Sequence, residues 1–235
     1  MVSFLKIEGK TVRGVFQERP NRFSALVKVE DKTLLTFLPN PGRMREFLIP
    51  GTEVILREVM KENRKTSYDL IGVTYKGQRV SVDSRVPNKL VLEALRNGDI
   101  EELSEYNIIK PEYGYGHTRF DFFLANKHES CLLEAKSATL VKDGVAMFPD
   151  AVTERGKRHV SDLVKAKKEG YRACIVFIVQ RTDAHAFAPS DETDSEFGKA
   201  LRNAAVKGVE IYAYKMEISK NFSLLSLSSR LDVNL

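Results

Sequence analysis

The chain has 235 residues, enough to bury a sizeable core as one large domain or two small ones. Hydrophobic residues make up 43% of it and charged residues 29%, which is typical of a globular protein and excludes a disordered chain. The apolar runs are too short to cross a bilayer, and Lys6, Glu8 and Lys10 interrupt the segment where a signal peptide would be apolar. We therefore expect a cytoplasmic protein with no membrane partner.

Positive charge is concentrated in the first third of the chain. Residues 1–85 contain 16 Lys and Arg against 10 Asp and Glu, whereas residues 86–235 contain 21 against 22. Such a field attracts polyanions, because each neutralised phosphate releases counterions. A mildly basic, solvated surface would give the same count, so the asymmetry suggests a nucleic-acid partner without requiring one.

Residues 1–85 have the pattern of an all-β domain. Short runs rich in β-branched and aromatic residues alternate with turn signals such as the Pro-Asn-Pro-Gly of residues 39–42. The predicted strands are residues 11–16, 24–29, 33–37, 52–57, 68–75 and 79–83. This pattern predicts a small β-barrel of the OB-fold type, a fold that commonly binds nucleic acid, although an SH3-like barrel would fit as well.

Residues 86–235 alternate helical and strand patterns. Asn88 is a candidate N-cap for a helix ending near Gly98, and the acidic, polar residues 190–196 read as a loop. The predicted helices are residues 90–96, 152–169 and 196–206, and the predicted strands are 108–113, 119–125, 130–137, 172–179 and 210–214. The order αβββαβαβ predicts an α/β sandwich of the PD-(D/E)XK nuclease type. The chain thus reads as a two-domain protein, with domains at 1–85 and 86–235.

Three side chains on two of these strands form a candidate catalytic site. Glu134 and Lys136 are two residues apart, so on a strand they share a face about 6.5–7 Å apart. Asp121 lies on the preceding strand, across a hairpin turn at residues 126–128. Carboxylates supply the hard oxygen ligands that Mg²⁺ prefers, and a lysine beside the metal can orient water and offset phosphate charge. The predicted cofactor is Mg²⁺ or Mn²⁺.

A Glu-x-Lys pair also arises by chance, and on a solvated strand face it would be only an ion pair. The surrounding residues argue against that reading, because Cys131, Leu132, Leu133 and Ala135 make the strand apolar on both faces, as in a buried central strand. Buried charges are costly unless they are paired or bind a metal. We therefore interpret these acidic and basic side chains as functional.

Other polar residues are weaker candidates. Glu93, on the helix before the sheet, matches a third acidic metal ligand in many nucleases of this fold, or else faces solvent. Arg155 and His159 lie four residues apart and share a helix face that could meet a phosphate or the metal site. No role is assigned to His117 or His185. The predicted DNA contacts are Arg13, Arg22, Asn40, Arg43, Arg45, Arg155 and His159.

The chain closely resembles the sugar fermentation stimulation protein family over nearly its whole length. The matching motifs are PNPGRM at 39–44, YG at 115–116, RFDF at 119–122, LEAKS at 133–137, FPDAVTERG at 148–156 with His159, GVE at 208–210 and AY at 213–214. The resemblance implies an OB-fold domain, a PD-(D/E)XK-like domain, sequence-nonspecific DNA binding and a link to sugar (maltose) metabolism. Phe120 replaces the proline of a typical P-D motif, and Pro41 stands where the family usually has threonine.

The sequence therefore predicts a DNA-binding protein with a divalent-metal-dependent phosphodiesterase site. An alternative is a non-catalytic DNA-binding regulator that kept the nuclease fold, and RNA is an alternative substrate because carboxylate–metal chemistry serves either backbone. The intact set of acidic and basic side chains favours the enzyme. The sequence does not indicate the preferred DNA structure, a regulated gene or the oligomeric state.

Overall fold

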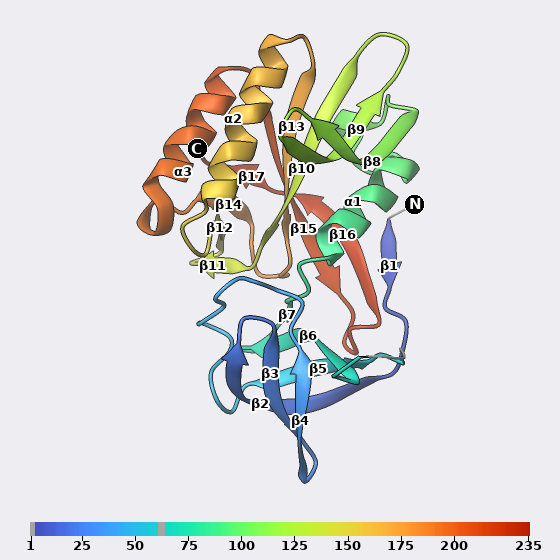
Figure 1. Cartoon of the computed structure of the whole chain (residues 1–235), viewed down its shortest axis with the longest axis vertical. Helices are drawn as coiled ribbons and strands as arrows, with labels where there is room; N and C mark the ends of the chain where they lie inside the picture. The colour runs from blue at the N-terminus through green and yellow to red at the C-terminus, as the bar shows by residue number, and fades with distance from the viewer. Residues whose placement is uncertain (1–2, 61–63) are drawn as a thin grey trace.

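The computed structural model describes residues 3–60 and 64–235 and divides them between two stacked domains (Figure 1). A β-barrel forms one end of the molecule, and a sheet flanked by helices forms the other. The barrel strands are β2 (Thr11–Asn21), β3 (Ser24–Val29), β4 (Lys32–Phe37), β5 (Glu53–Glu58), β6 (Tyr68–Tyr75) and β7 (Gln78–Ser81). These six strands match the six predicted from the sequence to within a few residues.

The barrel closes because its strands form a continuous ring of pairings. Antiparallel pairs run in the order β4-β3-β2-β5-β6, and a parallel pairing of Phe37 with Asp69 joins β4 to β6. Alternate side chains of each strand point inward, including Phe16, Val27 and Leu70 of a fully buried core. The predicted OB-like barrel is confirmed, with β7 added at its edge.

The second domain is built on a seven-stranded sheet in the order β1-β16-β15-β13-β10-β9-β8. Its strands are β1 (Phe4–Lys6), β8 (Ile108–Tyr115), β9 (Thr118–Ala125), β10 (Ser130–Ala138), β13 (Arg172–Val179), β15 (Glu210–Ile218) and β16 (Leu224–Arg230). The central strands β10, β13 and β15 are parallel, and β13 is apolar from Ala173 to Val179, as expected of a strand covered on both faces.

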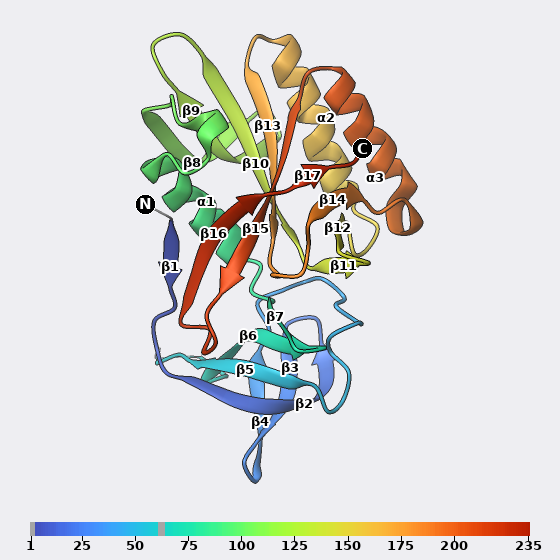
Figure 2. The ribbon, with the colours of Figure 1, turned by 180° about the vertical axis from the view of Figure 1, so that it is seen from behind.

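Helices cover both faces of this sheet. Helix α1 (Val86–Asn97) packs on one face, and α2 (Glu154–Lys168) and α3 (Asp191–Val206) lie side by side on the other (Figures 1 and 2). A smaller sheet contains β11 (Leu140–Lys142), β12 (Val145–Phe148), β14 (Ala186–Pro189) and β17 (Asp232–Val233). The predicted α/β sandwich is confirmed. Within the described residues 3–60 and 64–235, no helix has the length and apolarity needed to span a membrane.

The structure departs from the predicted elements in four places. Strand β1 belongs to the second domain, where it pairs with β16 at the edge of the sheet. Neither of these two strands was predicted from the sequence. Helix α1 begins after Arg85 because Pro87 occupies its first turn, so Asn88 is inside the helix. Helix α3 begins at Asp191, with a kink at Asp194, where a loop was expected. The strands of the small sheet were not predicted.

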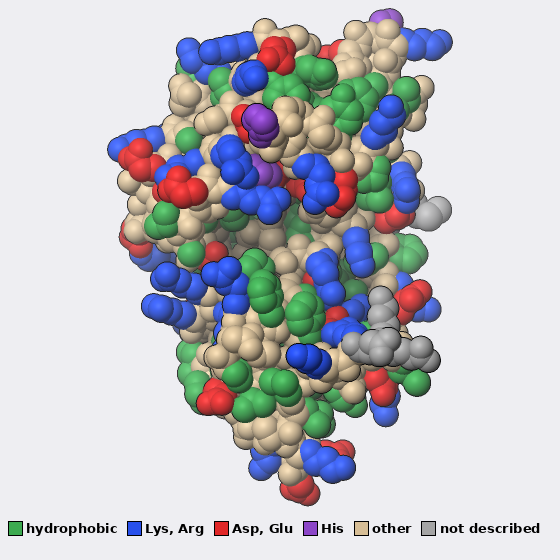
Figure 3. Space-filling model, in the orientation of Figure 1, with side chains coloured by type: hydrophobic (Ala, Val, Ile, Leu, Met, Phe, Trp, Pro, Cys, Tyr) green, Lys and Arg blue, Asp and Glu red, His purple; other side chains and the backbone are tan. Residues whose placement is uncertain are grey.

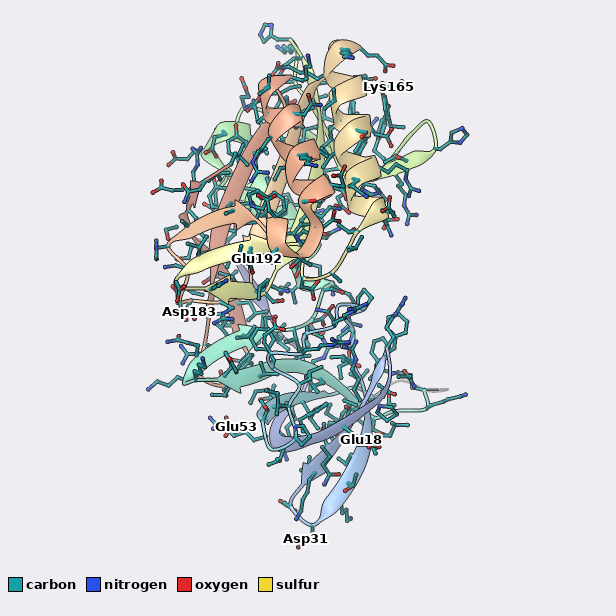
Figure 4. The ribbon with its side chains drawn as sticks, turned by 90° about the vertical axis from the view of Figure 1, so that its left-hand side faces the viewer. Glu18, Asp31, Glu53, Lys165, Asp183 and Glu192 are labelled. Carbon is teal, nitrogen blue, oxygen red and sulfur yellow. The ribbon has the colours of Figure 1, made fainter. Side chains whose placement is uncertain are left out.

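Several contacts fix the barrel against the second domain. The Ser81 amide and hydroxyl of β7 donate to the backbone and side-chain oxygens of Gln180, at 3.0 and 3.1 Å. The Arg181 guanidinium lies over the rings of Phe47 and Tyr75. In the view of Figure 4, Asp183 lies near this junction and Asp31 at the far tip of the barrel. The domains therefore meet through both polar and aromatic contacts.

Candidate functional site

Strands β9 and β10 separate at the candidate site. Their backbone pairing ends at Phe122 and Leu133, and beyond it the Ala135 amide donates instead to Oδ2 of Asp121, at 2.8 Å. Phe120 packs in the core under α2 and α3, whereas Phe122 packs in the core under α1, so the strand rotates at Asp121. The side chain of Asp121 thus replaces a backbone acceptor and opens a gap between the two strands.

Asn88 holds the second oxygen of this carboxylate. Its Nδ2 donates to Oδ1 of Asp121 at 2.5 Å, from the first turns of α1. The sequence had assigned Asn88 to the helix N-cap, and only the packing of α1 against the sheet reveals this contact. Both oxygens of Asp121 therefore have a donor that fixes the orientation of the carboxylate.

Glu134 is 2% exposed, and its two oxygens have different surroundings. Oε1 accepts from Nδ1 of His159 at 2.5 Å and also contacts the ammonium group of Lys136. Oε2 is buried and has no hydrogen-bond partner among the described residues. A buried oxygen without a partner is costly. Because the Glu134 charge is close enough to raise the pKa of Asp121, the two carboxylates together fit a hard divalent cation.

A chain of contacts connects Glu134 to the surface of α2. His159 donates to Glu134 through Nδ1, and its Nε2 accepts from Nε of Arg155 at 3.3 Å. His159 is buried against the ring of Phe120, while Arg155 is exposed. The predicted pair on one helix face is confirmed. His159 lies behind the carboxylate, so it positions Glu134 and does not present its ring to a ligand.

The two carboxyl groups differ in acidity because their surroundings differ. Burial, reinforced by the nearby Glu134 charge, raises the pKa of Asp121 to about 6. Burial alone would raise the pKa of Glu134, but the hydrogen bond from His159 and the charge of Lys136 outweigh it and hold that pKa below its usual value. Both groups are ionised above about pH 6, and a divalent cation would relieve their mutual repulsion.

The raised pKa of Asp121 predicts a pH-dependent effect of Asp121→Asn on stability. A carboxyl with a higher pKa in the folded than in the unfolded chain loses stabilisation as the pH rises, here between about 4 and about 6. Asparagine does not ionise, so the variant should be more stable than the wild type at pH 8, by up to about 3 kcal/mol. The gain should vanish near pH 4. Urea unfolding at pH 8 and pH 4 measures the difference in stability between the variant and the wild type. A difference of the same size at both pH values would contradict the prediction.

A cleft of about 860 Å³ lies between the domains and is lined by Asn88, Ala135, Lys136 and Arg155, which adjoin the two carboxylates. Both domains contribute to its walls, and basic side chains gather along the junction (Figure 3). The predicted site residues that line the cleft are Arg22, Asn40, Arg43, Lys136 and Arg155. Barrel and sheet residues that are far apart in the sequence therefore meet around one hollow.

Asn40 shapes the barrel wall of the cleft from within. Its side chain is 7% exposed, donates to the Val82 carbonyl at 2.9 Å and accepts from the Gly42 amide at 2.8 Å. The guanidinium of Arg19, on β2, donates to the carbonyls of residues 22, 40, 42 and 43. The predicted role of Asn40 as a DNA contact is thus not supported for its side chain, because both polar ends are already used.

Asp121, Glu134 and His159 do not line the cleft themselves, and three further predicted site residues lie away from both the cleft and the carboxylates. Arg13 pairs with Glu53 at 3.2 Å on the barrel surface, and Arg45 is exposed but does not line the hollow. Glu93 pairs with Arg96 one turn along α1, at 3.0 Å. Across residues 3–60 and 64–235 no three His, Cys, Asp or Glu side chains form a metal-binding group, so the structure does not bring Glu93 to the two carboxylates as a third ligand.

Known proteins resemble the chain along its whole length. The family model "Sugar fermentation stimulation protein RE domain" matches residues 85–222, and "SfsA N-terminal OB domain" matches residues 18–82. The sugar fermentation stimulation protein homologs of Caldanaerobacter subterraneus subsp. tengcongensis and Clostridium acetobutylicum are 44% and 45% identical, each covering 97% of this chain and 98% and 99% of the relative. The structure of Pyrococcus furiosus SfsA in complex with Ca²⁺ covers both chains completely at 29% identity, with a TM-score of 0.91. The chain belongs to the sugar fermentation stimulation protein family.

Proposed function

We propose that the chain binds DNA in the interdomain cleft, largely without sequence specificity, and hydrolyses phosphodiesters there with Mg²⁺ or Mn²⁺. The observation that carries the proposal is the buried Oε2 of Glu134, which has no partner among the described residues. Its carboxylate raises the pKa of Asp121 and contacts Lys136, which lines the cleft together with several arginines. The P. furiosus relative was solved with Ca²⁺, which also takes oxygen ligands, and this supports a divalent-cation site here.

Asp121 and Glu134 would hold the metal, which would supply an acidified water and offset phosphate charge. Asn88 and the Ala135 amide orient Asp121, and His159 orients Glu134, so neither carboxylate needs to rearrange on metal binding. The Lys136 ammonium contacts Glu134 and lines the cleft, where it can offset charge on the phosphate oxygens or orient the attacking water.

One observation favours the alternative of a non-catalytic DNA-binding regulator. Many nucleases of this fold use a third acidic ligand, and Glu93 is instead paired with Arg96. The family's link to sugar metabolism would suit a regulator, although no residue of the site indicates a sugar ligand. Against it, a protein that only grips DNA would gain affinity by neutralising Asp121 and Glu134, and both are retained.

Nicking of supercoiled plasmid separates the two functions. Wild-type protein incubated with Mg²⁺ or Mn²⁺ should convert plasmid to the open circle, and EDTA should prevent conversion while leaving binding measurable by fluorescence anisotropy. RNA of matched length tests the alternative substrate. Binding without cleavage of any DNA or RNA, in either metal, would leave the regulator as the function.

Salt dependence tests whether the cleft contacts phosphates. Arg22→Ala and Arg43→Ala each remove an exposed cation from the cleft wall, so each should weaken DNA binding and reduce the log–log salt slope by about 0.9. Lys165→Ala is the matched control, because Lys165 lies near the end of α2 farthest from the barrel (Figure 4). Anisotropy titrations over a salt series measure the slopes. An equal loss of DNA affinity in all three variants would mean that the DNA binds outside the cleft.

A further inference from the structure

The exposed Phe23 and the half-buried Phe37 form an aromatic surface on the barrel. Phe23 directly precedes β3, and Phe37 ends β4 opposite Ser24, so the two rings are neighbours across the hairpin. Their centroids are 6.5 Å apart, with an angle of 22° between the planes. Phe23 is 47% exposed, which leaves part of its ring open to a ligand.

Two arginines frame this surface. The guanidinium carbons of Arg64 and Arg85 lie over the Phe37 ring, 5.6 and 5.8 Å from its centroid. Both donate to the fully buried Asp69, at 2.6 and 2.8 Å, so their positions are fixed. Arg57 donates to the same carboxylate at 2.6 Å, which leaves an excess of positive charge beside the rings.

The aromatic surface adjoins the interdomain cleft through the chain itself. Arg22 and Ser84 line the cleft, and the residues that follow them, Phe23 and Arg85, belong to the aromatic surface. Arg85 also lines a second hollow of about 240 Å³, whose other charged side chains are Lys6, Glu8, Arg57, Asp83 and Lys89. A strand leaving the cleft would therefore pass directly onto stacked rings and guanidinium groups.

We propose that Phe23, Phe37, Arg64 and Arg85 form a stacking platform for the unpaired bases of a single-stranded nucleic acid. Aromatic rings stack on any base, but the base faces of a duplex are already covered by their neighbours. The fixed guanidinium groups match the phosphates between such bases. This inference rests on the proposed function and narrows its substrate to a strand that is unpaired next to the cleft.

Fluorescence provides a direct test, because the chain contains no tryptophan. Phe23→Trp places a single reporter on the platform, and Ile108→Trp places one at an equally exposed site on β8, in the other domain. With EDTA present, a thymidine oligonucleotide of about 12 nucleotides should quench the Phe23→Trp variant strongly and the Ile108→Trp variant little. The uridine oligonucleotide of the same length distinguishes DNA from RNA as the preferred strand.

Binding affinities complete the test. Phe23→Ala should weaken single-strand binding about 5- to 100-fold, leave duplex binding within about twofold, and be rescued by Phe23→Tyr. Circular dichroism verifies that each variant is folded. Absence of quenching at position 23, or equal losses for single strand and duplex, would overturn the inference. Plasmid nicking and duplex binding by the wild type report separately on the proposed function, and a protein that binds neither nucleic-acid form would overturn both.

Discussion

Replacing either Asp121 or Glu134 with alanine is expected to abolish divalent-metal binding and with it any cleavage of DNA. Each variant removes one of only two carboxylates at the site, and a single carboxylate holds Mg²⁺ or Mn²⁺ weakly in water. The fold should survive, because both groups contribute charge more than packing. Calorimetry with Mn²⁺ and plasmid nicking measure the two losses.

Unlike metal binding and cleavage, DNA affinity measured in EDTA should not fall when a carboxylate is removed. Asp121→Ala removes a negative charge near the bound phosphates, so its DNA affinity should equal or exceed that of the wild type. Lys136→Ala removes a positive charge, so this variant should bind DNA more weakly, and it should not cleave it. Glu192→Ala is the matched control, since Glu192 (labelled in Figure 4) is exposed and pairs with Lys142. Tight Mn²⁺ binding that persists in Asp121→Ala would place the metal at another site.

The sequence predicted most of the fold because the main elements carry strong local signals. Strand β13 is apolar on both faces and is bounded by Gly170, so its ends were predicted correctly. The barrel strands alternate and are separated by turn residues, which is enough to locate them. The pairing of β1 with β16 has no such signal, because it joins the two ends of the chain and depends on the completed sheet.

The site was predicted in part for the same reason. Alternation along β10 was enough to place Glu134 beside Lys136, and the hairpin brought Asp121 next to them. The contacts of Asn88 and Arg19 could not be predicted, because they depend on how α1 and the loop at residues 39–43 pack in three dimensions. The excess of positive charge in residues 1–85 also did not show which arginines line the cleft and which, such as Arg13, form ion pairs on the outer surface of the barrel.

Asp69→Ala is expected to be the most destabilising of these substitutions. Asp69 is fully buried and accepts from Arg57, Arg64 and Arg85, at 2.6, 2.6 and 2.8 Å. Burial alone would raise the pKa of this carboxyl, but the three arginines hold it below its usual value. Removing it leaves three guanidinium groups in mutual repulsion beside a buried site. Because these groups are partly solvated, we expect a loss of about 3 kcal/mol.

The pH dependence distinguishes this ion-pair cluster from a simple packing defect. A depressed carboxyl pKa stabilises the fold above the unfolded value, near 3.8, and the stabilisation is lost as the pH falls through the folded pKa. The difference between wild type and Asp69→Ala should therefore be full at pH 7 and shrink on acidification below about pH 4. Asp191→Ala, which breaks an exposed pair with Arg202, should cost less than about 0.5 kcal/mol.

Urea unfolding at pH 7 and pH 3 measures both variants, with DNA binding at pH 7 as a second readout. Asp69 holds Arg64 over Phe37 and shares Arg85 with Asp83, so releasing Arg64 should also weaken single-strand binding more than duplex binding. A loss of stability that is the same at both pH values would mean that Asp69 acts through packing. Unchanged single-strand affinity in a folded Asp69→Ala protein would mean that the stacking platform does not depend on fixed arginines.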